Sequence, residues 1–307
     1  MPGALRLGGA DVDGLVDPEG LIGVIEELLR GGARAPGRLS LEHGGSWLAS
    51  MAAAWSGYYA VKIVGVYPGN PARGLPLVRG VLLLFDASTG EPLLEAPAEE
   101  ATGWRTAAAS ALALRILGYR GGGVLGVIGA GVQAEYHLRV LTGTYRFDGV
   151  LVYSRTRARA EGLAARFNGQ AARGLEELLR ASTVVVAATT SREPVVKGAL
   201  LEGGSYVVSV GAPKPVRELD EHTVRRAGCI LVDTREGVLS ESGDVPGWVE
   251  TVELGEALQG RRACRHGDIA VYKSVGTAVF DLAVALHLYR QATRQSRTGT
   301  RQPGGGV

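Results

Sequence analysis

A glycine-rich turn between an apolar run and a helical stretch is the first candidate for chemistry in this sequence. The run VLGVI leads into Gly129 and Gly131, and Ala134 stands in the third small position. Gly129 permits a tight turn, Gly131 lets the backbone approach a pyrophosphate, and Ala134 lets the helix pack close to the strand. Amide groups at the helix N-terminus favour a bound phosphate. The pattern predicts a dinucleotide site rather than an ordinary glycine turn, with Val132 and Gln133 among the cofactor contacts.

A second candidate feature follows the run GVLVYS, where dinucleotide-binding folds place an acidic residue on the ribose of NAD. Ser154, Arg155 and Thr156 stand there instead. Hydroxyls and arginines suit a 2′-phosphate, which favours NADPH (NADP+), with NADH/NAD+ as the alternative. Thr189 and Thr190, after VVVAA, stand where a third strand would deliver residues to the cofactor. The competing interpretations are solvated arginines in an arginine-rich chain and threonines of an ordinary turn.

Three cationic residues are candidates for holding a substrate beside a nicotinamide. Lys62 lies inside the apolar run YYAVKIVGV, where a charged side chain is costly unless it is paired. Arg105 opens an alanine-rich helix, and Arg38 precedes the first apolar runs. Arginine binds a carboxylate bidentately and lysine binds it as a point charge. The competing interpretation is that the lysine extends to the surface and the arginines are solvated.

Composition and charge limit the class of protein. The chain has 307 residues, 46% apolar and 21% charged, which argues against a disordered chain, and its 46 glycines follow no triplet period. The formal charge of +2 gives no reason to expect a nucleic-acid partner. Positive charge resides in 29 arginines and only four lysines, a bias that codon usage explains. Each lysine is therefore worth locating.

The cysteines and the apolar runs bear on location and metal binding. Cys229 and Cys264 form no C-x-x-C pattern, so we expect no metal site, and the sequence leaves open whether they pair. The first residues lack the apolar segment of a signal peptide, and no run reaches the roughly 18 apolar residues of a membrane span. We expect a cytoplasmic protein that does not bind membranes.

The order of the expected elements changes near residue 122. Before it, DPEGLIGVIEELLRGG predicts a helix capped by Asp17, and YYAVKIVGVYP, LVRGVLLLFDAST and PLLEAP predict an antiparallel sheet. The segment EEATGWRTAAASALALRILG predicts a helix that ends at Gly118. After it, short valine-rich runs alternate with helical stretches, which indicates an α/β fold with a parallel sheet covered on both faces. A long apolar helix follows residue 268, and the tail SRTGTRQPGGGV is expected to be disordered.

Five segments together resemble the ornithine cyclodeaminase and mu-crystallin family. They are GVIGAGVQAEYHL, WRTAAASALA, VKIVGVYPGNP, VDTREGVLSESGDV and YKSVGTAVFDLA, and the resemblance covers the chain from about Arg38 to Ala285. The resemblance implies a Rossmann-type doubly wound sheet in residues 116–274. It also implies a mixed α+β substrate and dimerisation domain built from both chain ends, residues 1–115 and 275–307. An amino-acid or imino-acid substrate and a homodimer follow from the same resemblance.

The resemblance also assigns roles to individual residues. In that family three cationic residues hold the substrate carboxylate, and they match Arg38, Lys62 and Arg105, of which Lys62 and Arg105 are the candidate catalytic residues. The matching segments add further candidate contacts. They are Gly276 and Thr277 for the substrate, and Thr106, Val210, Gly211 and Lys273 for the cofactor.

One loop distinguishes the branches of the family. Cyclodeaminases and archaeal alanine dehydrogenases resemble each other in V-G-A-D-x-P-G-K-x-E-L-D, whose aspartate is assigned to orienting the substrate amine or activating water. This chain has VGAPKPVRELD, with Pro213 in the place of the aspartate and one residue fewer. Proline can neither accept a proton nor bind an ammonium. The sequence K-P-x-R-E-L resembles the same loop in the branch of the family that reduces cyclic ketimines, although that branch usually has one more residue in the loop.

The reaction that the resemblance implies is the reduction of a cyclic imino acid, such as Δ1-pyrroline-2-carboxylate to L-proline, with NADPH. Such a substrate arrives as an imine, so no amine must be deprotonated, and Lys62 can donate a proton or polarise the C=N bond. Ornithine cyclodeaminase and alanine dehydrogenase are the alternatives, with Asp233 or Glu218 in place of the missing aspartate. A non-catalytic protein that holds NADPH and a carboxylate ligand is an alternative of another class.

Overall fold

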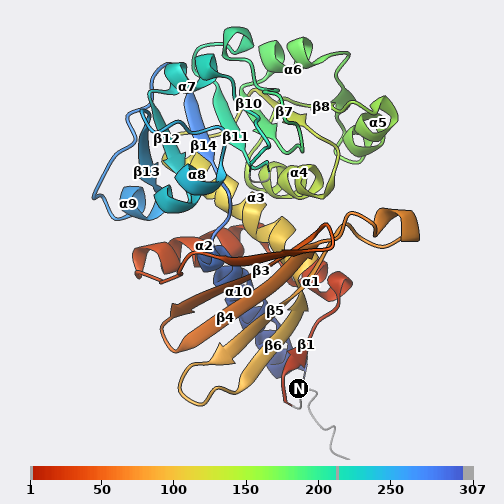
Figure 1. Cartoon of the computed structure of the whole chain (residues 1–307), viewed down its shortest axis with the longest axis vertical. Helices are drawn as coiled ribbons and strands as arrows, with labels where there is room; N and C mark the ends of the chain where they lie inside the picture. Colours follow the sequence, from red (N-terminus) through yellow and green to blue (C-terminus); the bar gives the residue numbers. More distant parts are fainter. Residues whose placement is uncertain (1–2, 212–213, 300–307) are drawn as a thin grey trace, which may run out of the picture. The chain divides into compact units, whose positions relative to one another are not determined.

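The computed structural model describes residues 3–211 and 214–299. It divides the chain into two compact units, Met1–Arg105 with Ala278–Val307, and Thr106–Thr277 (Figure 1). The first division lies within helix α3 (Ala98–Ile116), whereas the sequence placed it after residue 115, at the end of that helix. The second boundary between the units lies after Thr277, whereas the sequence analysis expected it after residue 274.

The first unit is built on a six-stranded sheet in the order β1-β6-β5-β4-β3-β2. The predicted antiparallel pairing is present between β4 and β5 and between β5 and β6. Strands β3 and β2, which the sequence analysis did not predict, extend it in antiparallel pairs, and β1 pairs with β6 in parallel. The strands are β1 (Leu5–Arg6), β2 (Leu39–His43), β3 (Ser46–Trp55), β4 (Tyr58–Val66), β5 (Val78–Asp86) and β6 (Pro92–Pro97). The helices are α1 (Gly9–Leu15), α2 (Pro18–Arg30), the short η1 (Pro71–Arg73) and α10 (Ala278–Gly299).

Helix α10 covers one face of this sheet, where it packs against α2 and strands β3 to β6 (Figure 1). Burial alternates along β4, so that Ala60, Lys62 and Val64 are buried while Tyr59 and Ile63 on the other face are exposed. This alternation is what a strand with one covered face requires. It directs the side chain of Lys62 toward the covered face.

The N-terminus of α2 is as predicted, whereas α10 extends further than predicted. The Asp17 carboxylate caps α2 by accepting a hydrogen bond from the Gly20 amide at 2.8 Å, and Pro18 stands in the first turn. Helix α10 continues to Gly299, so the first four residues of the tail predicted to be disordered are helical. The remainder of that tail, residues 300–307, lies outside the described residues.

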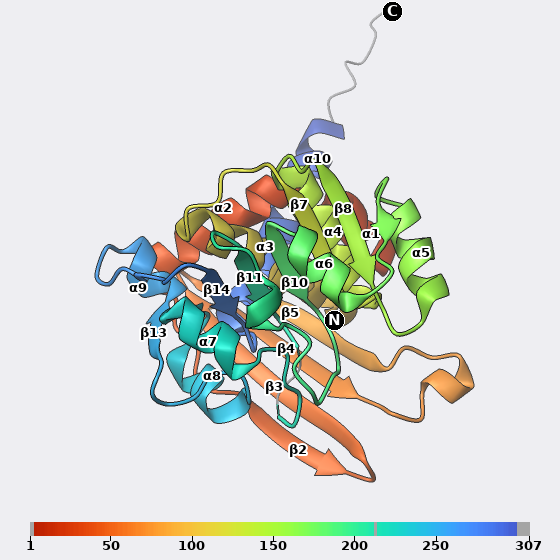
Figure 2. The same cartoon turned by 90° about the horizontal axis from the view of Figure 1, so that it is seen from above.

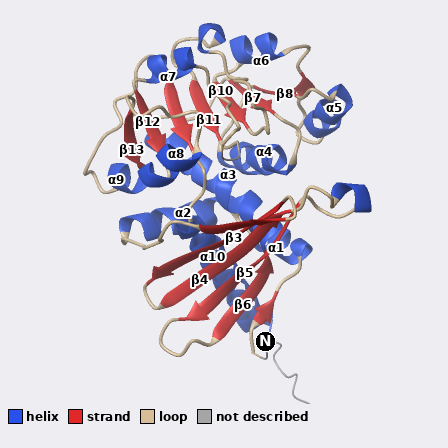
Figure 3. Cartoon of the chain, in the orientation of Figure 1, coloured by secondary structure: helices blue, strands red, loops and turns tan. Residues whose placement is uncertain are grey.

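The second unit holds eight parallel strands in the order β13-β12-β14-β11-β10-β7-β8-β9, the Rossmann-type sheet that the sequence predicted. Figure 2 labels β14, β11, β10, β7 and β8 of this sheet. Helix α4 lies on one face, and α6 and α7 lie on the other (Figure 3). The strands are β7 (Val124–Ile128), β8 (Gly149–Tyr153), β9 (Gln170–Ala171), β10 (Val184–Ala187), β11 (Tyr206–Ser209), β12 (Cys229–Val232), β13 (Glu250–Glu253) and β14 (Ala270–Lys273). The helices are α4 (Val132–Thr144), α5 (Arg157–Ala165), α6 (Leu175–Ala181), the short η2 (Gly198–Leu200), α7 (Glu221–Ala227), α8 (Arg235–Glu241) and α9 (Leu254–Leu258).

Parallel strands buried on both faces explain the continuous valine runs of this unit. All four residues of β10, β12 and β14 are buried, and they join a core that includes Val185, Val207, Ile230 and Val271. Side chains that point to either face meet helices, so both faces must be apolar. The carboxyl ends of these strands share one edge of the sheet, which is where open α/β sheets bind their ligands.

Cys229 and Cys264 form a disulfide bond, whereas the sequence left open whether they pair. Cys229 is the first residue of β12, and Cys264 lies in the segment between α9 and β14. Their Cα atoms are 5.6 Å apart, and 35 residues separate them in sequence. Among the described residues, no group of three or more His, Cys, Asp or Glu side chains is arranged to hold a metal ion. No helix in the described part of the chain is long and apolar enough to cross a membrane.

We expect Cys264→Ser to lower the free energy of unfolding by about 4 kcal/mol, because the cross-link restricts a 35-residue loop of the unfolded chain. Cys229 is fully buried and Cys264 is not, so substitution of Cys264 avoids burying a new hydroxyl. Denaturant unfolding with and without a thiol reductant measures the effect. Reduction of the unsubstituted protein serves as the control and is expected to give the same loss, whereas a variant that still responds to reductant would contradict the assignment.

Candidate functional site

The predicted dinucleotide turn joins β7 to α4 in the second unit. Gly129 has φ of +117°, and a Cβ atom there would collide with the backbone carbonyl oxygen of Ala188. Gly131 is the N-cap of α4, and a Cβ added to it would meet no atom within 4 Å. Ala134 is fully buried where the helix begins. The turn therefore needs glycine at its first position and leaves open space at the N-terminus of a 13-residue helix, an arrangement that fits a pyrophosphate.

The segment after β8 carries positive charge and hydroxyls. Arg155 and Thr156 are exposed, and the Thr156 amide lies 3.4 Å from the Ser154 hydroxyl that accepts its hydrogen bond. Arg157 forms an ion pair with Glu161 at 2.7 Å, whereas Arg155 forms no ion pair with any residue that the structure describes. Of Arg155 and Arg157, Arg155 is therefore the one whose charge is available to an anionic ligand.

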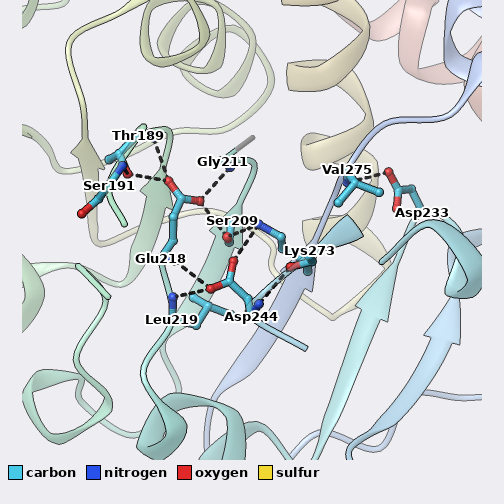
Figure 4. A network of polar contacts seen from close by, with 11 residues as sticks. Thr189, Ser191, Ser209, Gly211, Glu218, Leu219, Asp233, Asp244, Lys273 and Val275 are labelled. Carbon is cyan, nitrogen blue, oxygen red and sulfur yellow. Dashed lines mark hydrogen bonds and ion pairs between the residues drawn. The ribbon is translucent and has the colours of Figure 1, made fainter. Parts of the chain in front are cut away.

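One buried network of hydrogen bonds and an ion pair connects the carboxyl ends of β10, β11 and β14 (Figure 4). Glu218 accepts hydrogen bonds from Thr189 and Gly211, two residues that the sequence assigned to the cofactor. Lys273, also assigned to the cofactor, is 1% exposed and forms its ion pair with Asp244 at 2.8 Å. The ammonium of Lys273 is thus held by the interior of the unit.

Asp233 holds the segment that follows β14. One carboxylate oxygen accepts hydrogen bonds from the Ser274 hydroxyl and from the Val275 and Gly276 amides, and the other accepts from the Thr234 amide. The sequence raised Asp233 and Glu218 as replacements for a missing aspartate. Both carboxylates are held by donors of their own chain. Pro213, which stands in place of that aspartate, lies outside the described residues.

The remaining predicted residues of the second unit vary in exposure. Thr106 and Thr277 are buried, Val210 and Gln133 are half-buried, and Thr190 and Val132 are exposed. Nothing in these positions by itself assigns them to a ligand, so their cofactor and substrate contacts stay predictions.

A second cluster brings together two of the predicted substrate residues in the first unit. Lys62 Nζ of β4 lies 2.8 Å from Asp281 Oδ1 of α10, and Arg105 Nε of α3 lies 3.1 Å from the same oxygen. Lys62 Nζ also lies 3.4 Å from the Thr102 hydroxyl. Lys62, Arg105 and Asp281 are 1%, 6% and 1% exposed, so the ion pairs are enclosed. Two buried cations share one carboxylate oxygen.

Burial sets the electrostatics of this cluster. The pKa of Lys62 is lowered to about 8: loss of hydration is the largest cause, the charge of Arg105 adds to it, and the attraction and hydrogen bond of Asp281 oppose both. The charge of Arg38 adds a smaller lowering, which brings the third predicted cation into the electrostatic surroundings of Lys62. Buried Nη1 of Arg105 has no hydrogen-bond partner among the described residues. The cluster carries excess positive charge and an unused buried donor, which suits a carboxylate.

The sequence and the fold of this chain are similar to those of known proteins. Residues 20–296 match the profile of the Ornithine cyclodeaminase/mu-crystallin family. The chain belongs to this family. The ketimine reductase mu-crystallin of Mus musculus is 36% identical over 233 residues, which cover 74% of each chain.

Two solved structures of similar proteins cover nearly the whole chain. The Δ1-pyrroline-2-carboxylate reductase of Thermococcus litoralis, in complex with NADH and L-proline, superimposes with a TM-score of 0.87 at 32% identity, covering 95% of this chain and 98% of that one. An archaeal alanine dehydrogenase dimer with bound NAD gives a TM-score of 0.87 at 30% identity, covering 95% and 97%. This member of the ornithine cyclodeaminase/mu-crystallin family therefore shares the architecture of both reductases and dehydrogenases.

Sequence reasoning missed two acidic residues of this family member. Asp281 lies in the apolar helix segment TAVFDLAVAL, and Asp244 lies in a loop. The signal for Asp281 was present, because a carboxylate in an apolar helix is costly unless a cation pairs with it, as is a lysine in an apolar strand. No such signal marks Asp244, since loops commonly contain aspartate.

Proposed function

We propose that the protein reduces a cyclic imino acid, such as Δ1-pyrroline-2-carboxylate to L-proline, with NADPH in preference to NADH. The observation that carries the proposal is the enclosed pair of cations, Lys62 and Arg105, on a single oxygen of Asp281, with Arg105 Nη1 unused among the described residues. A 2-carboxylate next to the C=N bond is the anion that such a cluster suits. The similarity to a Δ1-pyrroline-2-carboxylate reductase supports the same substrate class.

The three cations have separable roles in this proposal. Arg105 and Arg38 bind the carboxylate, and Lys62 supplies the proton that the imine nitrogen gains. The amine of Lys62 suits this role because its pKa of about 8 keeps it protonated at neutral pH yet makes it a stronger acid than an ordinary lysine. Asp281 holds the ammonium in place through the 2.8 Å contact. A bound reduced nicotinamide supplies the hydride that the imine carbon gains.

The cofactor is assigned to the turn between β7 and α4. Gly129, Gly131, Val132 and Gln133 supply the backbone around the pyrophosphate, in line with the open space at Gly131. The preference for NADPH rests on Arg155, whose exposed guanidinium forms no ion pair with a described residue. NADH and NAD are the cofactors named in the two similar structures, so the preference of this chain requires its own measurement.

We expect Arg155→Ala to raise the Kd for NADPH about tenfold or more and to leave the Kd for NADH nearly unchanged, because only NADPH carries the 2′-phosphate. Arg157→Ala is the matched control, since Arg157 is already paired with Glu161. Isothermal titration of each variant with both cofactors measures the effect. Equal changes for the two cofactors, or an equal effect of Arg157→Ala, would refute the assignment of Arg155 to the phosphate.

The reaction is tested by mixing the protein, NADPH and Δ1-pyrroline-2-carboxylate and following the near-ultraviolet absorbance of the reduced nicotinamide. Loss of that absorbance with formation of L-proline is the expected result. Release of ammonia from ornithine with NAD+ would identify a cyclodeaminase, and formation of alanine from pyruvate and ammonia would identify an alanine dehydrogenase. Cofactor binding without turnover of any of these substrates would favour a carrier of NADPH and a carboxylate ligand.

We also propose that the protein is a homodimer that covers the open face of the six-stranded sheet. That face exposes Leu39, Leu41, Leu48, Tyr59 and Ile63, with Leu39 and Leu41 about three-quarters exposed. An apolar sheet face of this kind is normally covered in the assembled protein. The similar alanine dehydrogenase is described as a dimer. Sedimentation of the protein gives the subunit number, and replacement of Leu41 by Lys is expected to shift it toward the monomer.

A further inference from the structure

The Glu218 carboxylate is enclosed by four hydrogen-bond donors at the carboxyl ends of β10 and β11 (Figure 4). One oxygen accepts from the Thr189 amide at 2.7 Å and from the Thr189 hydroxyl at 2.9 Å. The other accepts from the Ser209 hydroxyl and the Gly211 amide, both at 2.7 Å. The side chain is fully buried. Backbone amides can only donate, so this arrangement is built for the ionised carboxylate.

The same network contains a second carboxylate and only one cation. Lys273 Nζ lies 2.8 Å from Asp244 Oδ2 and donates to the Ser209 hydroxyl at 3.0 Å. The other oxygen of Asp244 accepts from the amides of Glu218 and Leu219. Burial raises the pKa of Glu218, and the charge of Lys273 with the surrounding donors offsets only part of that shift. With both acids ionised, the enclosed network carries one uncompensated negative charge.

The strand order puts this charge on one half of the dinucleotide site. The glycine turn follows β7, with β8 on one side of it and β10, β11 and β14 on the other. In dinucleotide-binding sheets the residue after the second strand, here β8, contacts the ribose of the adenosine half. The nicotinamide half must then extend to the other side. Thr189, Gly211 and Lys273 stand at the carboxyl ends of those strands.

Oxidised nicotinamide carries a positive ring charge that the reduced ring lacks. A buried charge without a counter-ion acts over a longer distance than a solvated one, because little water screens it. We propose that Glu218 is a positioning residue that biases the site toward oxidised cofactor: it fixes Thr189 and Gly211 and adds the negative charge that the positive ring prefers. This inference rests on the proposed function only in that both require a nicotinamide cofactor.

The test compares the Kd values for oxidised and reduced cofactor in the absence of substrate. The whole protein is titrated with NADP+ and NADPH, or with NAD+ and NADH if it binds that pair instead. Glu218→Gln keeps the size of the side chain and removes its charge. We expect it to raise the ratio of the Kd for oxidised cofactor to the Kd for reduced cofactor at least threefold. Ser209→Ala is the matched control, because it removes a neutral hydroxyl from the same network, and it is expected to change both Kd values by one factor.

An unchanged ratio in Glu218→Gln, or an equal shift in Ser209→Ala, would overturn the proposal. If Glu218→Gln does not fold, Asp244→Asn removes one negative charge from the same network and is expected to move the ratio in the same direction. The absence of that shift would count equally against the proposal. Failure of the proposed function is a separate result. If the protein binds both forms of the cofactor but reduces no imino acid, the proposed function is wrong, and the two Kd values still test the role of Glu218.

Discussion

Replacing Lys62 by methionine is expected to lower kcat for imine reduction by about a thousandfold, since a positioned proton donor contributes roughly 10²–10⁴ in rate. Methionine has nearly the length of lysine and fills the same space beside α10 without the charge. Asp281 keeps Arg105 at 3.1 Å as a partner, so no buried carboxylate is left without a cation. The loss therefore reports on the amine rather than on a collapsed cluster.

The controls for Lys62→Met separate chemistry from folding and from cofactor binding. The Kd for the cofactor is expected to stay within about twofold of the unsubstituted value, and Lys197→Met, at a half-buried lysine of the other unit, is expected to keep full activity. In the unsubstituted protein the rate falls as pH rises through about 8, because Lys62 loses its proton there. A Lys62→Met variant with the normal rate, or with the same alkaline fall, would exclude Lys62 as the proton donor.

The prediction of Lys62 from sequence and the failure to predict Asp281 have one physical explanation. A lysine inside an apolar strand implies a partner, because a lone buried ammonium is too costly. The sequence does not show where that partner is, since 219 residues separate Lys62 from Asp281 and only the packing of α10 on the sheet brings them together. Periodicity predicts an element and its buried face, but it does not predict which faces meet.

The cofactor unit illustrates the same limit. The turn at Gly129 was predictable because a positive φ and a close approach to Ala188 leave no choice of residue. The loop residue Glu218 was considered only as a substitute acid, whereas in the structure it holds Thr189 and Gly211. A loop carboxylate that accepts from an amide of its own loop, Gly211, and from one of another loop, Thr189, has no local sequence pattern, because the contact with Thr189 depends on the strand order.

Asp281→Asn is expected to destabilise the protein by about 3–5 kcal/mol, because it leaves Lys62 and Arg105 buried without a counter-charge. Glu27→Gln is the control, since Glu27 of α2 pairs at the surface with Arg290 of α10, the helix that carries Asp281, and a surface ion pair contributes less than about 1 kcal/mol. Denaturant unfolding at neutral pH measures both. The double variant Lys62→Met with Asp281→Asn is expected to lose less than the sum of the two single variants, because only one buried cation remains in it.

The pH dependence of Asp281→Asn tests the electrostatic origin of its effect. Asp281 raises the pKa of Lys62 by attraction and by a hydrogen bond, so its removal lowers that pKa below about 8. The lowered pKa affects both the rate and the stability of the variant. The fall in rate with rising pH moves to lower pH, because Lys62 loses its proton at a lower pH. The destabilisation is largest below the new pKa, where both cations are charged, and it shrinks as pH rises through that value, because a neutral amine is less costly to bury. A constant loss of stability across this pH range, with the alkaline fall in rate still near pH 8, would mean that Asp281 acts through packing alone and that its charge does not set the acidity of Lys62.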